Sequence, residues 1–156
     1  MHHAPILAPW IPLAFFLGVC GAALWKGGRD ERIVSAAFLA DVIASLALLQ
    51  YRTGTQWGVF AVDGLFFILL VAVALKSRRY WPIAAAGFQL LAILTHAAST
   101  FDPHLGGWAY ITAGIIWTDL VTLSLAVGTY NRWRERRQLA AMAADGSIAE
   151  PGATRL

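Results

Sequence analysis

Three aspartates, one glutamine and one histidine lie within long apolar stretches of this sequence, where polar side chains are rare. The aspartates are Asp41, Asp63 and Asp119, and the other two residues are Gln89 and His96. Carboxylates, imidazoles and amides can relay protons, hold a small cation or form hydrogen bonds between helices. These stretches contain no Lys or Arg, so His96 is the single cationic partner that they offer to the aspartates. Two unpaired carboxylates therefore need a proton, a bound cation or water to compensate their charge.

The apolar stretches have the length and composition of membrane-spanning helices. The chain has 156 residues, of which 58% are hydrophobic and only 13% are charged, whereas about a quarter of the residues in a soluble domain are charged. A helix needs roughly 20 residues at ~1.5 Å per residue to cross a hydrocarbon layer of ~30 Å. We therefore predict an all-α fold, an integral membrane helical bundle with five transmembrane helices. The predicted spans cover about residues 9–25, 33–50, 57–75, 82–99 and 108–130.

The distribution of basic residues predicts the orientation of the bundle. The N-terminus, the four loops in order and the tail contain 0, 3, 1, 3, 0 and 5 Lys or Arg residues. The first loop, the third loop and the tail therefore share one side, which the positive-inside rule makes cytoplasmic. We predict a multi-pass protein of the bacterial inner membrane with its N-terminus outside. Residues 1–130 form a single transmembrane domain, and residues 131–156 form a basic cytoplasmic tail that is partly helical and then disordered.

The depth of each polar residue follows from its distance to the end of its span at ~1.5 Å per residue. Asp41, Gln89 and Asp119 fall near the midplane, whereas Asp63 and His96 fall in a second layer nearer the outer face. One interpretation is that these side chains form hydrogen bonds between packed helices. The other is a functional polar site that relays protons or holds a small cation. The sequence leaves both interpretations open.

Two further groups of residues predict contacts with the surroundings of the bundle. Small residues recur every fourth position in the first span, a pattern that allows close approach of another helix; they are Ala14, Gly18 and Ala22. Arginines crowd the start of the tail, where they can contact anionic lipid headgroups; they are Arg132, Arg134, Arg136 and Arg137. Because the basic residues flank apolar spans, we expect the lipid bilayer as a partner and no nucleic acid.

Sequence motifs of enzymes are absent. The chain contains no glycine-rich phosphate loop, nucleophile elbow, HExxH or CxxC, so we assign no catalytic residue and predict no cofactor. His2, His3, Asp102 and His104 are expected on the same side as the outer layer. They leave open a metal site on that face, but no pair has a recognised metal-binding spacing, and no metal ligand is assigned.

Three segments resemble a group of short membrane proteins of alphaproteobacteria to which no activity is assigned. They are the loop at residues 27–32, residues 79–82, and the stripe that runs from Gln89 to His96. The likeness covers most of residues 20–135 and implies a bacterial inner membrane and the same multi-span fold. It carries over no catalytic residue.

The function expected from these patterns is a non-enzymatic accessory or assembly subunit, in a homo-oligomer or a larger membrane complex. Its small and polar stripes would pack against other helices. The first alternative is a small transporter, channel or proton-conducting protein that uses the intramembrane aspartates. The second alternative is a membrane enzyme with a metal site formed by the Asp and His residues of the outer face. The short loops leave little room for a catalytic domain, so enzymatic activity is the least expected.

Overall fold

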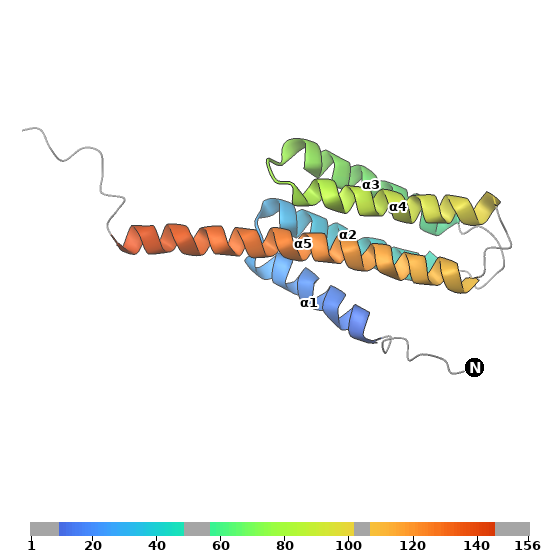
Figure 1. Cartoon of the computed structure of the whole chain (residues 1–156), viewed down its shortest axis with the longest axis horizontal. Helices are drawn as coiled ribbons and strands as arrows, with labels where there is room; N and C mark the ends of the chain where they lie inside the picture. Colours follow the sequence, from blue (N-terminus) through green and yellow to red (C-terminus); the bar gives the residue numbers. More distant parts are fainter. Residues whose placement is uncertain (1–9, 49–56, 102–106, 146–156) are drawn as a thin grey trace, which may run out of the picture.

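The computed structural model describes residues 10–48, 57–101 and 107–145, and these residues form helices without any strand. The helices are α1 (Trp10–Lys26), α2 (Arg29–Leu48), α3 (Trp57–Lys76), α4 (Trp81–Phe101) and α5 (Gly107–Ala144). Consecutive helices run in opposite directions (Figure 1). Each helix packs against the next, and α1 and α5 also pack against each other, so the five form a closed ring. The predicted all-α class and helical bundle are confirmed.

The turn between α1 and α2 is short because it consists of two glycines. A Cβ atom on Gly27 would overlap the carbonyl oxygen of Ala23 and lie 2.8 Å from Cβ of Glu31. The backbone N–H of Gly28 donates a hydrogen bond of 2.8 Å to Oε2 of Glu31. A glutamate at this third helical position satisfies one of the unpaired N–H groups at the start of α2.

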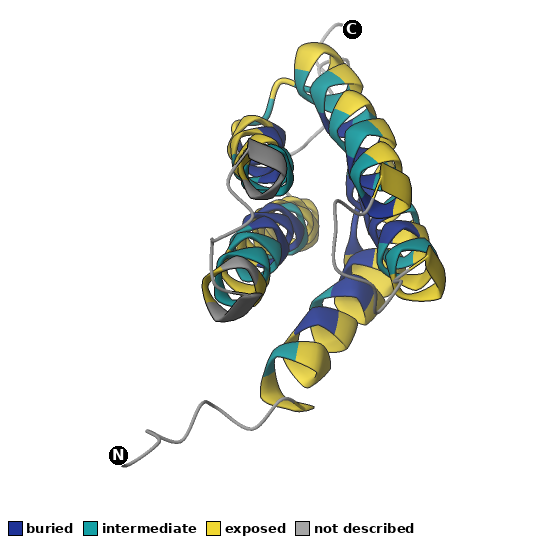
Figure 2. Ribbon diagram, turned by 90° about the vertical axis from the view of Figure 1, so that its right-hand side faces the viewer, coloured by how far each residue is buried: buried dark blue, intermediate teal, exposed yellow. Residues whose placement is uncertain are grey.

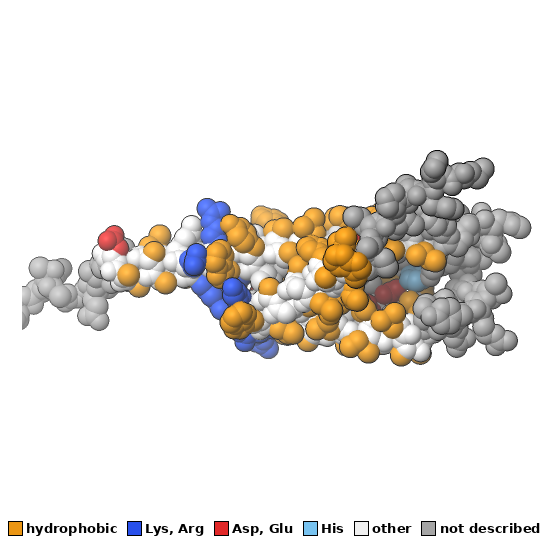
Figure 3. Space-filling view, turned by 90° about the horizontal axis from the view of Figure 1, so that it is seen from below, with side chains coloured by type: hydrophobic (Ala, Val, Ile, Leu, Met, Phe, Trp, Pro, Cys, Tyr) orange, Lys and Arg blue, Asp and Glu red, His pale blue; other side chains and the backbone are white. Residues whose placement is uncertain are grey.

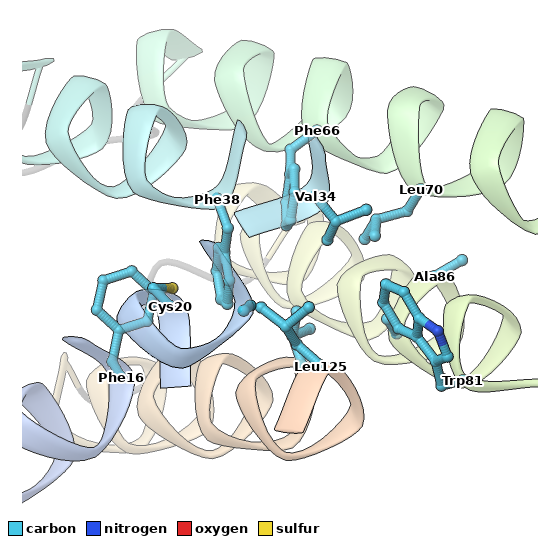
Figure 4. Close-up of a cluster of buried hydrophobic side chains, with 12 residues drawn as sticks. Phe16, Cys20, Val34, Phe38, Phe66, Leu70, Trp81, Ala86 and Leu125 are labelled. Carbon is cyan, nitrogen blue, oxygen red and sulfur yellow. The ribbon is translucent and has the colours of Figure 1, made fainter. Parts of the chain in front are cut away.

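The apolar core lies where α1, α2 and α3 meet, and it extends to α4 and α5 (Figure 4). The ring of Phe38 from α2 is shared by two aromatic contacts. Its centroid lies 4.9 Å from that of Phe16 in an edge-on arrangement and 4.9 Å from that of Phe66 in a stacked one. Ser35 of α2 also donates a hydrogen bond of 3.0 Å to the carbonyl oxygen of Cys20 on α1. These contacts fix the rotation of α1, α2 and α3 about their own axes.

The close packing of α4 on α5 depends on one glycine. Trp81, the first residue of α4, is 6% exposed. A Cβ atom on Gly128 of α5 would lie 2.7 Å from three atoms of the Trp81 ring. The indole therefore occupies the space that any other residue at position 128 would need for its side chain.

Lys and Arg side chains gather at one end of the bundle, which we call the basic end. It carries the α1–α2 turn, the α3–α4 turn and the part of α5 that projects beyond the other helices (Figures 1 and 3). α5 continues through residue 130, where we had expected the last span to give way to the tail, and its 38 residues form one helix. Alanine, arginine and glutamine favour the helix, and neither Gly nor Pro follows Gly128 before its end. The end expected to be disordered, residues 146–156, lies outside the described residues.

The buried faces of the helices point inward (Figure 2), and the outer surface of the bundle carries many apolar side chains (Figure 3). Leu65 and Ile68 of α3, for example, are 68% and 64% exposed. Extended apolar surfaces of this kind are unusual on soluble monomers. Among the described residues, α3, α4 and α5 are long and apolar enough to cross a membrane, and α1 is a shorter apolar helix. These features indicate a membrane protein.

Candidate functional site

A cavity of about 260 Å³ lies between α2, α3, α4 and α5, in the half of the bundle remote from the basic end. Most of its wall is apolar, and we call it the polar cavity after the polar side chains set into that wall. Its apolar walls include Phe38 and Val59. Its polar lining comes from four helices and comprises Asp41, Ser45, Asp63, Gln89, His96 and Thr118. Figure 3 shows acidic and histidine side chains together in this half of the molecule, away from the Lys and Arg residues. The fold therefore brings two aspartates, Gln89 and His96 together in the half of the interior that is remote from the basic end.

Asp63 is the most heavily contacted group in the cavity. Its Oδ2 atom lies 2.8 Å from Nε2 of His96. Its Oδ1 atom accepts a hydrogen bond of 3.2 Å from Nε2 of Gln89. Gln89 and His96 are seven residues apart and so lie on one face of α4, two turns from each other. Both oxygen atoms of the Asp63 carboxylate are thus held by one neighbouring helix.

Asp41 contrasts with Asp63 because its carboxylate has no such partner. The residue is only 7% exposed, and its Oδ1 atom is buried without a hydrogen bond to any described residue. The hydroxyl oxygen of Ser45, one turn further along α2, is also buried without a hydrogen bond to any described residue. Leaving a buried polar atom unsatisfied costs about 1–3 kcal/mol, and more for a charged group. The cavity therefore presents two adjacent oxygen atoms that a donor from outside the described chain can satisfy.

The cavity is closed toward the basic end by the aromatic cluster. Phe38 forms part of its wall and contacts both Phe16 and Phe66. Beyond these rings lie apolar residues such as Leu70 and Leu125, each fully buried. Buried hydroxyl groups in this region bond to backbone carbonyls of their own or a neighbouring helix. In this conformation the polar lining does not continue through the described core to the basic end.

The structure brings four of the five expected intramembrane residues into this cavity. Asp119 does not line it and is half-buried on α5. Its neighbour Thr118 does line the cavity, because successive residues of a helix point about 100° apart. Gln89, which depth counting grouped with Asp41 and Asp119, contacts Asp63. Two helical turns, about 10 Å along the axis, separate Gln89 from His96. The side chains of these two residues span that distance because the carboxylate of Asp63 lies between them.

The small residues of α1 do not pack against other helices of this chain. Ala14, Gly18 and Ala22 are exposed, and a Cβ atom on Gly18 would meet nothing within 4 Å. α1 instead turns Phe16 and Cys20 toward the bundle, because these larger side chains remove more apolar area from the exterior.

A further polar contact beside the cavity was not anticipated from the sequence. Nε1 of Trp117 donates a hydrogen bond of 3.0 Å to Oγ1 of Thr95, which in turn donates to the carbonyl oxygen of Leu91. This contact joins α4 to α5 next to His96. In the sequence, only the position of Trp117 in the middle of a predicted span indicated such a contact, and it did not identify Thr95 as the partner.

The arginines at the start of the tail lie on the projecting part of α5. Arg132 contacts Glu135 at 3.3 Å, and Arg137 lies over the ring of Trp133 at 4.3 Å. Arg134 and Arg136 are exposed.

Metal ligation finds no support within the part of the chain that the structure describes, where no group of three or more His, Cys, Asp or Glu residues could hold an ion. His2, His3, Asp102 and His104, on which the metal alternative depended, lie outside the described residues. Comparison with protein-family models, with curated proteins and with solved structures gave no match. The functional argument therefore rests on the cavity.

Proposed function

We propose that the protein is a small carrier of the bacterial inner membrane, with five spans, and that the polar cavity binds a small cation that bears N–H donors. In this proposal the N-terminus lies outside and the basic end faces the cytoplasm, so the cavity lies in the outer half of the membrane. The positive-inside rule supports the orientation, because Lys and Arg gather at the basic end. The observation that carries the proposal is the buried, unpartnered carboxylate oxygen of Asp41.

The charge of the cavity favours a cation. Asp41 and Asp63 contribute two carboxylates, and His96 can compensate only one of them. His96 already lies against Asp63. An uncompensated charge buried in an apolar bundle is strongly destabilising. A single positive charge placed beside Asp41 would balance the site.

Hydrogen bonding and volume narrow the chemical class of the cation. Asp41 and Ser45 together offer acceptors, so the ligand should carry donors, as a primary ammonium group does. A volume of about 260 Å³ is close to the lower limit of ~300 Å³ for typical ligand pockets. The apolar walls suit a short alkyl chain. We therefore expect a small alkylammonium ion to be preferred over a bare metal cation.

The closed side of the cavity favours a carrier over an open channel. The stacked rings of Phe38 and Phe66 separate the cavity from the basic end. Passage to the other side would require these rings to part, as expected of a protein that exposes its site to one side at a time.

Ligand-dependent stabilisation of the purified protein tests this proposal. The protein is placed in lipid nanodiscs, and thermal unfolding is followed by tryptophan fluorescence with ethylammonium, tetramethylammonium or sodium chloride. A ligand at 100 times its Kd stabilises the folded state by about 2.7 kcal/mol, which corresponds to a Tm increase of about 5–10 °C at this chain length. We expect that increase with ethylammonium only, since tetramethylammonium has no N–H donor.

Two variants show whether the response arises in the cavity. Asp41→Asn removes the charge that the ligand would neutralise and should abolish the increase in Tm. Asp119→Asn is the matched control, because Asp119 is a half-buried intramembrane aspartate that does not line the cavity. Equal stabilisation by all three cations, or a response that survives Asp41→Asn, would refute the proposal.

An accessory or assembly role is the second candidate, and the exposed face of α1 favours it. Ala14, Gly18 and Ala22 leave a smooth surface that another helix could approach closely. Ala22 also borders a groove of about 380 Å³ between α1 and α5. Gly18→Leu would block such packing without disturbing this chain, because nothing lies within 4 Å of the new Cβ atom. Loss of a native complex in mild detergent on this substitution would support the accessory role, and an unchanged complex would count against it.

A further inference from the structure

A second concave site lies at the basic end, between the start of α4 and the middle of α5. This groove has a volume of about 620 Å³. One part of its wall is apolar, with Ala84 one turn into α4 and Val127 on α5. Arg134 and Gln138 lie two and three turns further along α5, on the part that projects from the bundle. The groove is therefore apolar toward the middle of the bundle and cationic toward its end.

Part of the positive charge in the groove is compensated within the protein. Arg79 donates a hydrogen bond of 2.6 Å to Glu135, and it also lies 3.9 Å from the buried Glu31. These contacts join the α3–α4 turn to α5 and to the start of α2. They occupy Arg79, which consequently has little capacity for a further anion.

Two other arginines in the groove have no counter-charge. Arg78 and Arg134 both line it and both are exposed. Neither forms an ion pair within the part of the chain that the structure describes. With Arg78, Arg79 and Arg134 set against Glu135, the formal charge of the lining is 3 − 1 = +2. The groove thus attracts an anion of one or two charges.

Trp81 adds an unused hydrogen-bond donor to the same site. Its side chain forms part of the groove wall, and its Nε1 atom is buried without an acceptor among the described residues. The ring is held against Gly128 and has no free space on that side. An anion that enters beside the ring can supply the missing acceptor.

We infer that this groove binds the headgroup phosphate of an acidic phospholipid, with Arg78 and Arg134 as its counter-charges. Basic pockets between spanning helices on the cytoplasmic side are suited to such headgroups. The order of apolar and cationic walls matches an acyl chain followed by a phosphodiester. A zwitterionic lipid carries no net charge and would leave the two arginines uncompensated. This site is separate from the polar cavity, and its test does not depend on cation binding.

Native mass spectrometry of the whole protein in mild detergent tests the inference. The probes are phosphatidylglycerol, phosphatidylcholine and inorganic phosphate, each titrated separately. We expect bound phosphatidylglycerol on the parent protein and at least tenfold weaker binding of phosphatidylcholine. Each arginine near an anionic surface contributes about fivefold in affinity. Replacing both, as Arg78→Gln with Arg134→Gln, should therefore weaken phosphatidylglycerol binding about 25-fold.

The matched control is the double variant Arg136→Gln with Arg137→Gln. It removes the same charge from the same end of the molecule, but neither residue lines the groove. Its affinity for phosphatidylglycerol should stay within about threefold of the parent. An equal loss in both double variants would show a general surface attraction and overturn the inference. Displacement of the lipid by inorganic phosphate would also overturn the inference, because the groove would then be a site for a free anion. Tm values of both variants show whether each remains folded.

Discussion

The contact between Trp81 and Gly128 offers the sharpest test of the bundle. It fixes the distance between α4 and α5, the two helices that form the groove and part of the polar cavity. The substitution Gly128→Ala adds a single methyl group. Its Cβ atom would lie 2.7 Å from three ring atoms, so the indole must retreat by about 0.7 Å to reach the 3.4 Å of an ordinary contact.

The cost follows from the burial of the ring. Trp81 is 6% exposed and forms part of the apolar core, so it cannot move without shifting its neighbours. Overpacking of this kind costs about 1–3 kcal/mol. Against this, replacing Gly by Ala in a helix gains roughly 0.8–1.0 kcal/mol. Gly87→Ala is the matched control, because it makes the same gain on α4 and its Cβ atom meets nothing within 4 Å.

The comparison of the two variants isolates the packing cost. We expect Gly128→Ala to be less stable than Gly87→Ala by about 1–3 kcal/mol, which lowers Tm by roughly 2–12 °C for a chain of this size. The assay is thermal unfolding in nanodiscs, followed by circular dichroism at 222 nm. Adding Trp81→Phe should recover part of the loss, since the smaller ring leaves room for the methyl group. Equal Tm values for Gly128→Ala and Gly87→Ala would refute the packing of α4 on α5 described above.

Two further predictions concern the core and the basic end. Phe38→Ala removes the ring shared by both aromatic contacts, and we expect the free energy of unfolding to fall by about 3–5 kcal/mol. Chemical denaturation in detergent measures this change. A decrease below ~1 kcal/mol would contradict the assignment of Phe38 to the core. The hydrogen bond from Arg79 holds the pKa of Glu135 below its usual value. A lowered folded pKa means that the contact stabilises the protein above the pKa that Glu135 has in the unfolded chain, and that this contribution is lost as the pH falls through the lowered value. Spin labels at positions 77 and 138 should therefore move apart only in that acidic range, and Glu135→Gln should remove the pH response.

The five helices of the described residues could be predicted from the sequence because each signal is local. Apolar runs of sufficient length, separated by charged or glycine-containing segments, indicate helices without reference to any other part of the chain. The turn at Gly27 and Gly28 illustrates this: α1 ends just before the two glycines, and Glu31 caps the start of α2. The tail after residue 130 was predicted to be partly helical, and α5 does continue to Ala144, because the change from apolar to basic composition marks a membrane boundary and carries no signal to end a helix.

The grouping of polar residues could not be predicted in the same way. Depth counting separates residues along the membrane normal, but it says nothing about which face of a helix meets which neighbour. Asp119 shares a depth with Asp41 and yet lies outside the cavity, while Thr118 lines it. The stripe of Ala14, Gly18 and Ala22 could also be recognised in the sequence. The sequence did not determine whether this stripe faces another helix of the chain or the exterior of the bundle.

The three aspartates, Gln89 and His96 thus mark the division between sequence and tertiary structure. The amino-acid sequence by itself determined that these polar groups sit in apolar helices and lack Lys or Arg partners, because composition and spacing are properties of single segments. Only the packing of four helices decided that both carboxylate oxygens of Asp63 have partners on α4 while Asp41 is left with an unsatisfied oxygen. The rotation and stagger of each helix are set by large side chains such as Phe38 and Trp81, which pack against residues of other helices. The chemistry of the cavity therefore depends on core contacts that no local pattern specifies.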